Sequence, residues 1–169
     1  MYTYLLPYVE RPKSVGTIRL NSTDPFEPPL IDSNALSNTT DLDDFIEIVR
    51  LGFIILETTS LSNHVTLPKL PVPGCSFCPN KPIHKCDQYI KCLIKQIATT
   101  GYHPCCSCRM GSVNRSDVVV NERLKVKGIE NLRVCDASIM PEITNGNTNS
   151  PSIMIGEHCS DLIKTDHKC

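Results

Sequence analysis

The most informative part of the chain is residues 131–157, which read NLRVCDASIMPEITNGNTNSPSIMIGE. The apolar run over 132–135 predicts a short strand that delivers Asp136 to a ligand at its end. The polar run over 145–149 leads into a helix predicted over 151–163, with Pro151 in its first turn. A helix start carries about half a positive charge and free N–H groups, which suit an anion or an electron-rich ligand edge. Asn and Ser are also favoured caps, but capping alone does not explain three Asn within five residues.

A second segment, residues 101–111, reads GYHPCCSCRMG. A residue before proline is held extended rather than helical, so His103 presents its ring from a loop. A single His is more often structural than catalytic, but the polar helix start over 145–149 supplies a partner for chemistry. The two segments together therefore predict a catalytic or ligand-binding site.

The rest of the chain mixes short strands with separate helices. Strands are predicted over 2–10, 15–20 and 117–120, with an extended piece over 30–32. Helices are predicted over 41–58, opened by a capping box at 40–43, and over 86–99. The core-facing side chains are expected to be Tyr89, Leu93 and Ile97 in the helix over 86–99, and Ile153, Ile155, Cys159 and Leu162 in the last helix. Strand runs and separate helices indicate an α+β fold.

Charge and hydropathy exclude two classes of partner. Lys and Arg number 17 and Asp and Glu number 18, for a formal net charge of -1. No basic excess exists to neutralise phosphates, so no nucleic-acid partner is expected. The longest nearly apolar stretch, residues 51–56, is far shorter than the ~20 residues of a membrane helix, so no membrane partner is expected either.

The chain has ten cysteines and three glycosylation sequons, at Asn21, Asn38 and Asn114. This composition favours an oxidising compartment, so we expect a secreted or extracellular glycoprotein. The first ten residues, however, lack the basic and apolar regions of a signal peptide. We therefore expect this sequence to be a piece or short isoform of a longer protein.

The cysteines of the proline-rich segment allow two interpretations. One interpretation is a zinc knuckle formed by Cys75-x-x-Cys78, His84 and Cys86, although this spacing matches no well-defined zinc-binding motif. The alternative, which we favour, is that disulfides tie the loop over 66–86 to the following helix, with no metal bound. Cys135 and Cys159 lie in apolar surroundings and are expected to be inert core residues.

Four patterns occur in order along the chain. Arg11-Pro-Lys-Ser precedes Asp24-Pro-Phe-x-Pro-Pro-Leu-Ile-Asp32, and His-Pro begins the run over 103–111 that ends in Met-Gly. Asp-Ala-Ser-x-Met-Pro closes the strand at 136–141, and Gly-Asn-Thr-Asn-x-Pro spans 146–151. Together they resemble the C-terminal half of the glucose-methanol-choline (GMC) family of flavin-dependent oxidoreductases, most closely its insect glucose-dehydrogenase-type members.

The resemblance implies an architecture. Residues 1–100 would be a substrate-binding domain with an antiparallel sheet and flanking helices. Residues 101–169 would supply the catalytic loop, strands and final helix that complete the FAD-binding domain. By analogy with insect relatives, Cys75 would pair with Cys92, although Cys78 and Cys86 are alternative partners.

The resemblance also implies a mechanism with FAD as cofactor and a small-molecule alcohol or sugar as substrate. His103 matches the catalytic His that takes or orients the hydroxyl proton, and Asn147 matches the second catalytic position. Asp136 and Ala137 match residues at the ribityl-phosphate region of the cofactor. Thr148 and Asn149 open the final helix, whose positive end would face the flavin.

Two departures from the family pattern matter. The family's Gly-Thr after His-Pro-x is Cys106-Ser107 here, and Cys opposes the positive φ that Gly adopts easily. No Gly-x-Gly-x-x-Gly fingerprint is present, so we expect the family's N-terminal dinucleotide-binding part to be missing from this sequence and to be a partner of this chain. We expect the isolated chain to bind FAD weakly or not at all and to be inactive. The alternative is a non-catalytic truncated isoform or a secreted, disulfide-bonded binding protein derived from this domain.

Overall fold

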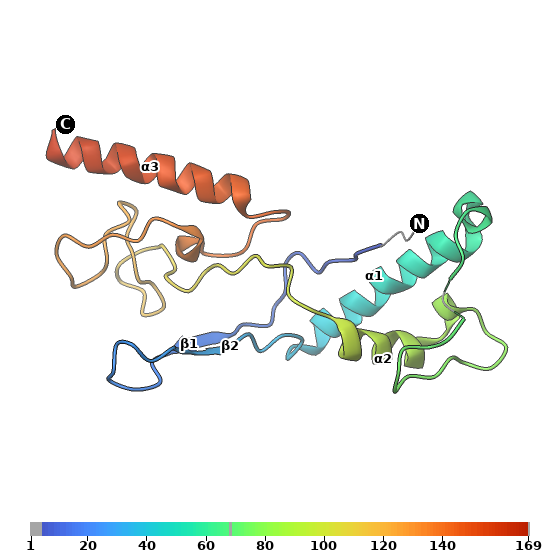
Figure 1. The fold of residues 1–169 in the computed structure, drawn as a ribbon. Helices are drawn as coiled ribbons and strands as arrows, with labels where there is room; N and C mark the ends of the chain where they lie inside the picture. The colour runs from blue at the N-terminus through green and yellow to red at the C-terminus, as the bar shows by residue number, and fades with distance from the viewer. Residues whose placement is uncertain (1–4, 68, 169) are drawn as a thin grey trace. The chain divides into compact units, whose positions relative to one another are not determined.

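The computed structural model describes residues 5–67 and 69–168. Figure 1 shows strands β1 (Thr17–Arg19) and β2 (Leu30–Asp32) and helices α1 (Thr39–Thr58), α2 (Asp87–Ile97) and α3 (Asn149–His167). Short 3-10 turns lie at Ser60–Asn63, Ile83–Lys85 and Ala137–Ile139. β1 and β2 form a two-stranded antiparallel sheet, so the predicted α+β class is confirmed. Within the described residues, every helix is too short or too polar to cross a lipid bilayer.

The chain divides into two compact units. The first holds the residues up to Gly16 together with Asp32–Gly101, and the second holds Thr17–Ile31 together with the chain from Tyr102 onward. The sequence placed residues 17–31 with the first part, whereas the structure groups Thr17–Ile31 with the second unit. The reason is local packing, because Ile18 of β1 lines a pocket with Pro104 and Asp136 of the second unit.

Two groups of predicted strands are wrong. Residues 5–10 form no strand, and residues 2–4 of that prediction lie outside the described residues. Leu5 instead packs on α1, where a Cβ added at Gly52 would meet Leu5 Cδ2 at 2.9 Å. The expected strands over 117–120 and 132–135 are reduced to isolated bridges, such as Val120 with Val126. Left-handed turns at Leu124 and Asn131 bend this part of the chain before longer ladders form.

The start of α1 differs from the predicted capping box at 40–43. Asn38 is the N-cap, and its side chain accepts from Thr40 N at 2.9 Å. Asp41 is only 2% exposed, and its carboxylate accepts from the backbone N–H groups of Lys13 (2.8 Å) and Ser14 (2.7 Å) and from the Ser14 hydroxyl. Asp41 therefore ties the N-terminal segment to α1 instead of capping the helix.

α1 and α2 build the core of the first unit. Val49, Ile90 and Ile94 are buried against each other. In α2, Tyr89 is buried and Leu93 packs on the core as expected, and Ile90 and Ile94 join them, whereas Ile97 is 57% exposed. Ile97 is the last residue of α2, which ends there rather than at residue 99.

Two disulfides fix the proline-rich loop to α2. The structure joins Cys75 to Cys92, as the resemblance implied, and Cys78 to Cys86. The cysteines of the possible zinc knuckle are therefore consumed as disulfides, and the described residues hold no cluster of three or more metal-ligand side chains. His84, the fourth member of that pattern, has a different partner.

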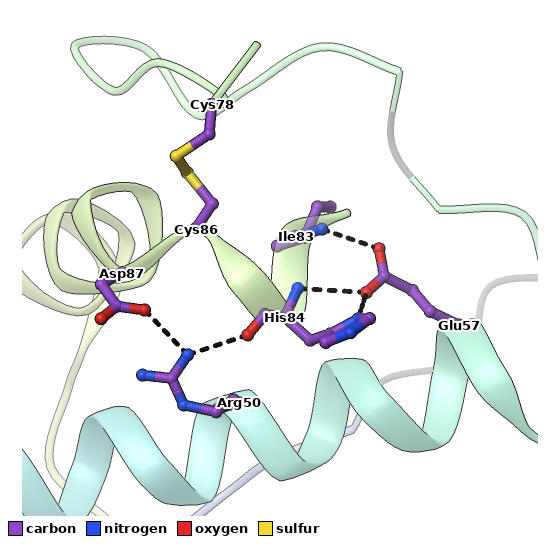
Figure 2. Close-up of a disulfide and its surroundings, with 7 residues drawn as sticks. All are labelled: Arg50, Glu57, Cys78, Ile83, His84, Cys86 and Asp87. Atoms are coloured by element: carbon purple, nitrogen blue, oxygen red, sulfur yellow. Dashed lines mark hydrogen bonds and ion pairs between the residues drawn. A yellow bond between two sulfur atoms is a disulfide. The ribbon is translucent and has the colours of Figure 1, made fainter. Parts of the chain in front are cut away.

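Figure 2 shows that Glu57 of α1 caps the turn at Ile83–Lys85. Its carboxylate accepts from Ile83 N (2.9 Å) and His84 N (3.1 Å) and pairs with His84 Nδ1 (2.5 Å). Burial raises the pKa of Glu57, but these bonds outweigh burial and hold it below its usual range. Arg50 donates to Asp87 Oδ1 and to the His84 carbonyl oxygen, each at 2.8 Å, which attaches the same turn to α1 a second time.

The second unit is centred on α3. Val120, Leu124, Ile139, Met140, Ile155 and Cys159 form its buried cluster. Ile153 was expected in this core but is 59% exposed. Ile155 and Cys159 are four residues apart and share one helix face, whereas Ile153 lies two residues from Ile155 and points away.

Cys135 and Cys159 form a disulfide, which corrects the expectation that they are inert core residues. The bond joins the segment just before Asp136 to the middle of α3. Near the end of α3, Asp166 pairs with Lys125 Nζ (3.0 Å) and with Arg123 and Arg133. The hydrogen bond from Lys125, with those from both arginines, lowers the pKa of Asp166 to about 2.

The Asp41 bonds predict a pH-dependent stability. Burial raises the pKa of Asp41, but the donors of Lys13 and Ser14 hold it below its usual range. A lowered folded-state pKa stabilises the protein above the unfolded value of about 4, and this contribution is lost as the pH falls through the folded value. We expect Asp41→Asn to lower the free energy of unfolding at pH 7 by about 1–3 kcal/mol, because an amide nitrogen would face N–H donors.

Urea unfolding at a series of pH values measures this effect. The matched control is Asp43→Asn, since Asp43 is an exposed acid of the same helix. A stability gap between Asp41→Asn and the native chain that persists unchanged below the pKa of a free carboxyl would contradict the assignment.

The Cys135–Cys159 bond closes a loop with a sequence separation of 24 residues. Its loss in a Cys135→Ala/Cys159→Ala variant should lower the free energy of unfolding by about 3 kcal/mol, because the unfolded chain regains loop freedom. Urea unfolding compares this variant with Cys108→Ser, which removes a free thiol of the same unit. Equal stabilities of the two variants would show that the bond contributes little.

Candidate functional site

His103 lies between two residues from the start of α3. Asn147 Nδ2 is 3.1 Å from His103 Nε2, and Thr148 Oγ1 is 3.0 Å from His103 Nδ1. The structure thus brings together three of the predicted site residues, although Thr148 is 45 positions from His103 in the chain. His103 is half-buried, Thr148 is buried, and Asn147 is exposed.

The two contacts match one tautomer of the neutral ring. An amide nitrogen only donates, so with Asn147 Nδ2 facing His103 Nε2 the matching tautomer accepts at Nε2. Nδ1–H then donates to the Thr148 hydroxyl. An unprotonated ring nitrogen beside an exposed amide is what a proton acceptor requires.

The start of α3 is left open by this arrangement. Thr148 is the N-cap of the helix, but its hydroxyl contacts His103 instead of capping the helix. Ser152, four residues later, donates to the Thr148 carbonyl oxygen from its N–H (3.0 Å) and its hydroxyl (2.6 Å). The first N–H groups of α3 and its positive end are consequently available to a ligand.

The loop that carries His103 is held against residues 137–139. Cys106 N, Cys108 N and Met110 N donate to the carbonyl oxygens of Ala137 (3.3 Å), Ser138 (2.9 Å) and Ile139 (2.8 Å). The sequence indicated that Cys106 opposes a positive φ, yet Cys106 adopts φ 70°. These hydrogen bonds and packing on the second unit's core hold it there.

An open pocket of about 440 Å³ adjoins this loop. Its lining includes Pro104, Cys105, Ser107, Asp136, Ala137 and Ser152. His103 and Asn147 are not part of the lining, and Pro104 connects His103 to it. Asp136 also accepts from Ser138 N at 2.8 Å and so caps the turn at Ala137–Ile139. Asn149 is the exposed first residue of α3.

Of the nine lining residues, sequence reasoning named only Asp136 and Ala137 as site residues, and it missed Ser152 among the others. The spacing of Ser152 to Thr148 was a usable signal, because residues four apart on a helix are neighbours. The small side chains of Ser107, Ala137 and Ser152 leave backbone accessible in the pocket, which could therefore hold part of a flat, polar cofactor.

The family model and the curated relatives that match this chain point to the same family. The family model described as GMC oxidoreductase matches residues 12–156. The chain is 39% identical over 154 residues to the mitochondrial choline dehydrogenase of Mus musculus and 37% identical over 161 residues to the glucose dehydrogenase [FAD, quinone] of Drosophila melanogaster. These matches cover 91% and 95% of this chain but 24% and 25% of those proteins. The chain spans about a quarter of the length of these curated relatives.

The fold of this chain is also similar to that of solved oxidase structures. A formate oxidase of Aspergillus oryzae, studied for the modification of its FAD, matches with a TM-score of 0.76 and 31% identity, over 90% of this chain and 25% of that one. A fungal aryl-alcohol oxidase matches with a TM-score of 0.70 and 27% identity, over 91% of this chain and 24% of that one. The similarity therefore extends across both units.

The hydrogen bonds of His103 predict its tautomer. Above about pH 8, where an ordinary histidine is neutral, ¹⁵N-detected NMR should find the proton of the His103 ring on Nδ1. Thr148→Val removes the acceptor of that proton and should shift the ring toward the Nε2–H form, whereas Thr148→Ser keeps the hydroxyl and should not. A native ring protonated mainly on Nε2 would mean that Asn147 presents its carbonyl oxygen instead.

Proposed function

Because the chain belongs to the GMC oxidoreductase family, we propose that it is the C-terminal part of an FAD-dependent enzyme that oxidises the CH–OH group of a small alcohol or sugar. The observation that carries the proposal is the placement of the His103 ring, with Asn147 Nδ2 3.1 Å from Nε2 and Thr148 Oγ1 3.0 Å from Nδ1. The names of the relatives, which include an alcohol dehydrogenase, a choline dehydrogenase and a glucose dehydrogenase, support this substrate class.

The residues present fit the flavin end of FAD. Asp136 and Ala137 line a pocket with small side chains, and Thr148 and Asn149 open a helix whose positive end suits an electron-rich ring. The side chain at Cys106, where the family has Gly, packs on the hydrophobic core. When bound, FAD would supply the hydride acceptor. We propose that these four residues contact it.

His103 and Asn147 would act on the substrate oxygen. When a substrate hydroxyl replaces the hydrogen bond between the two side chains, which is 3.1 Å long, the lone pair of Nε2 can take the hydroxyl proton and the Asn147 amide can donate to the same oxygen. Thr148 keeps the proton on Nδ1, which reserves Nε2 as the base. Its own burial holds the hydroxyl in place, so Thr148 is a positioning residue for the ring.

The compartment proposed for this activity is an oxidising one. The described residues contain three disulfides, which form and persist mainly in secreted or lumenal proteins. Of the three sequon asparagines, Asn38 is engaged as the N-cap of α1, whereas Asn21 and Asn114 are exposed. We therefore propose a secreted glycoprotein modified at Asn21 or Asn114.

The function is tested in the FAD-loaded protein that contains this chain. His103→Ala should slow flavin reduction by an alcohol or sugar donor roughly 10²–10⁴-fold, because the proton acceptor is lost. Asn147→Ala should slow it less, since only a hydrogen bond is removed. Rapid-mixing absorbance follows flavin bleaching directly, and the visible spectrum reports FAD content.

The matched control is His158→Ala, which removes an exposed histidine from α3. It should leave the rate unchanged. Equal reduction rates in the native protein, His103→Ala and Asn147→Ala would refute the assignment and favour the non-catalytic alternative.

A further inference from the structure

Cys105 and Cys106 are adjacent free thiols whose sulfur atoms lie 3.0 Å apart. Neighbouring side chains of an extended chain point to opposite sides. The left-handed φ of 70° at Cys106 breaks that alternation and accompanies the close approach of the two sulfurs. A disulfide bond is about 2.0 Å long, so bonding would bring the two sulfur atoms about 1 Å closer and, because the residues are adjacent, would close a ring whose Cα atoms lie nearer than in most disulfides.

The backbone around the pair is already fixed. The N–H groups of Cys106 and Cys108 donate to the carbonyl oxygens of Ala137 and Ser138. Cys105 lines the open pocket, so a small reagent can reach the pair. No function proposed above uses either sulfur.

The two thiols are not equivalent. Burial, and next the neighbouring Cys106, raise the pKa of the Cys105 thiol to about 12. Because burial disfavours the Cys105 thiolate, Cys105 is the poorer nucleophile, and the attacking role in the reaction below is assigned to the Cys106 sulfur.

We propose that Cys105 and Cys106 form a vicinal dithiol site that a hydroperoxide oxidises to a disulfide. The Cys106 sulfur attacks the peroxide oxygen, the O–O bond breaks, and the Cys106 thiol proton leaves with the alkoxide as an alcohol (or with hydroxide as water), so that Cys106 becomes a sulfenic acid. The Cys105 sulfur then attacks Cys106 Sγ, the S–O bond breaks, and water leaves with the proton of Cys105. In total, two thiols are oxidised to one disulfide, and one hydroperoxide is reduced to an alcohol and water.

The test uses the full chain with Cys108→Ser, which removes the third free thiol of the loop. The protein is treated with hydrogen peroxide, alkylated with iodoacetamide without reduction, and cut with trypsin. Cleavage after Lys95 and Arg109 releases residues 96–109, in which Cys105 and Cys106 are then the only cysteines. We expect this peptide to be unalkylated and lighter than the dithiol peptide by the mass of two hydrogen atoms.

Two further variants separate the roles of the sulfurs. Cys105→Ser/Cys108→Ser leaves Cys106 without a resolving thiol, so dimedone should trap a sulfenic acid on Cys106. Cys106→Ser/Cys108→Ser should lose most of this labelling. Two alkyl groups on the 96–109 peptide of Cys108→Ser after peroxide treatment would overturn the proposal, whether or not the double variants fold.

Discussion

The hydrogen bond between His103 Nδ1 and the Thr148 hydroxyl is the contact on which the site depends. Thr148 makes no side-chain cap on α3, so this bond orients the ring while the helix start stays open. At the start of α1, in contrast, the Asn38 side chain accepts from Thr40 N. The contrast between the two helix starts shows why α1 is a structural element and α3 a candidate ligand site.

The rest of the second unit supports this contact. The Cys135–Cys159 disulfide holds α3 to the segment that ends at Asp136, and the pairs of Asp166 hold its far end. The His103 loop is in turn bonded to residues 137–139 through three backbone hydrogen bonds. Since the imidazole and Thr148 must stay within 3.0 Å, both of their segments need to be fixed to one core.

The sequence singled out His103, Asn147 and Thr148 because their segments resemble the family's His-Pro and Gly-Asn-Thr-Asn-x-Pro patterns, and the structure brings the three side chains together. The cap of α1 was mispredicted because Asp41 carries a capping-type side chain but bonds to Lys13 and Ser14, a contact that no local pattern records. The disulfide between Cys135 and Cys159 was not predicted for the same reason, since apolar neighbours are equally compatible with a free thiol and a disulfide.

Cys106 stands where the family pattern has Gly, and it is also one of the two sulfurs of the proposed dithiol site. A left-handed backbone costs a non-glycine residue roughly 1–2 kcal/mol, so the loop keeps this conformation only because its hydrogen bonds and core packing are stronger. Those contacts belong to the backbone of Ala137 and Ser138 and do not require glycine at 106. The site can therefore retain its loop geometry with a side chain there, and that same geometry is what places a sulfur beside Cys105.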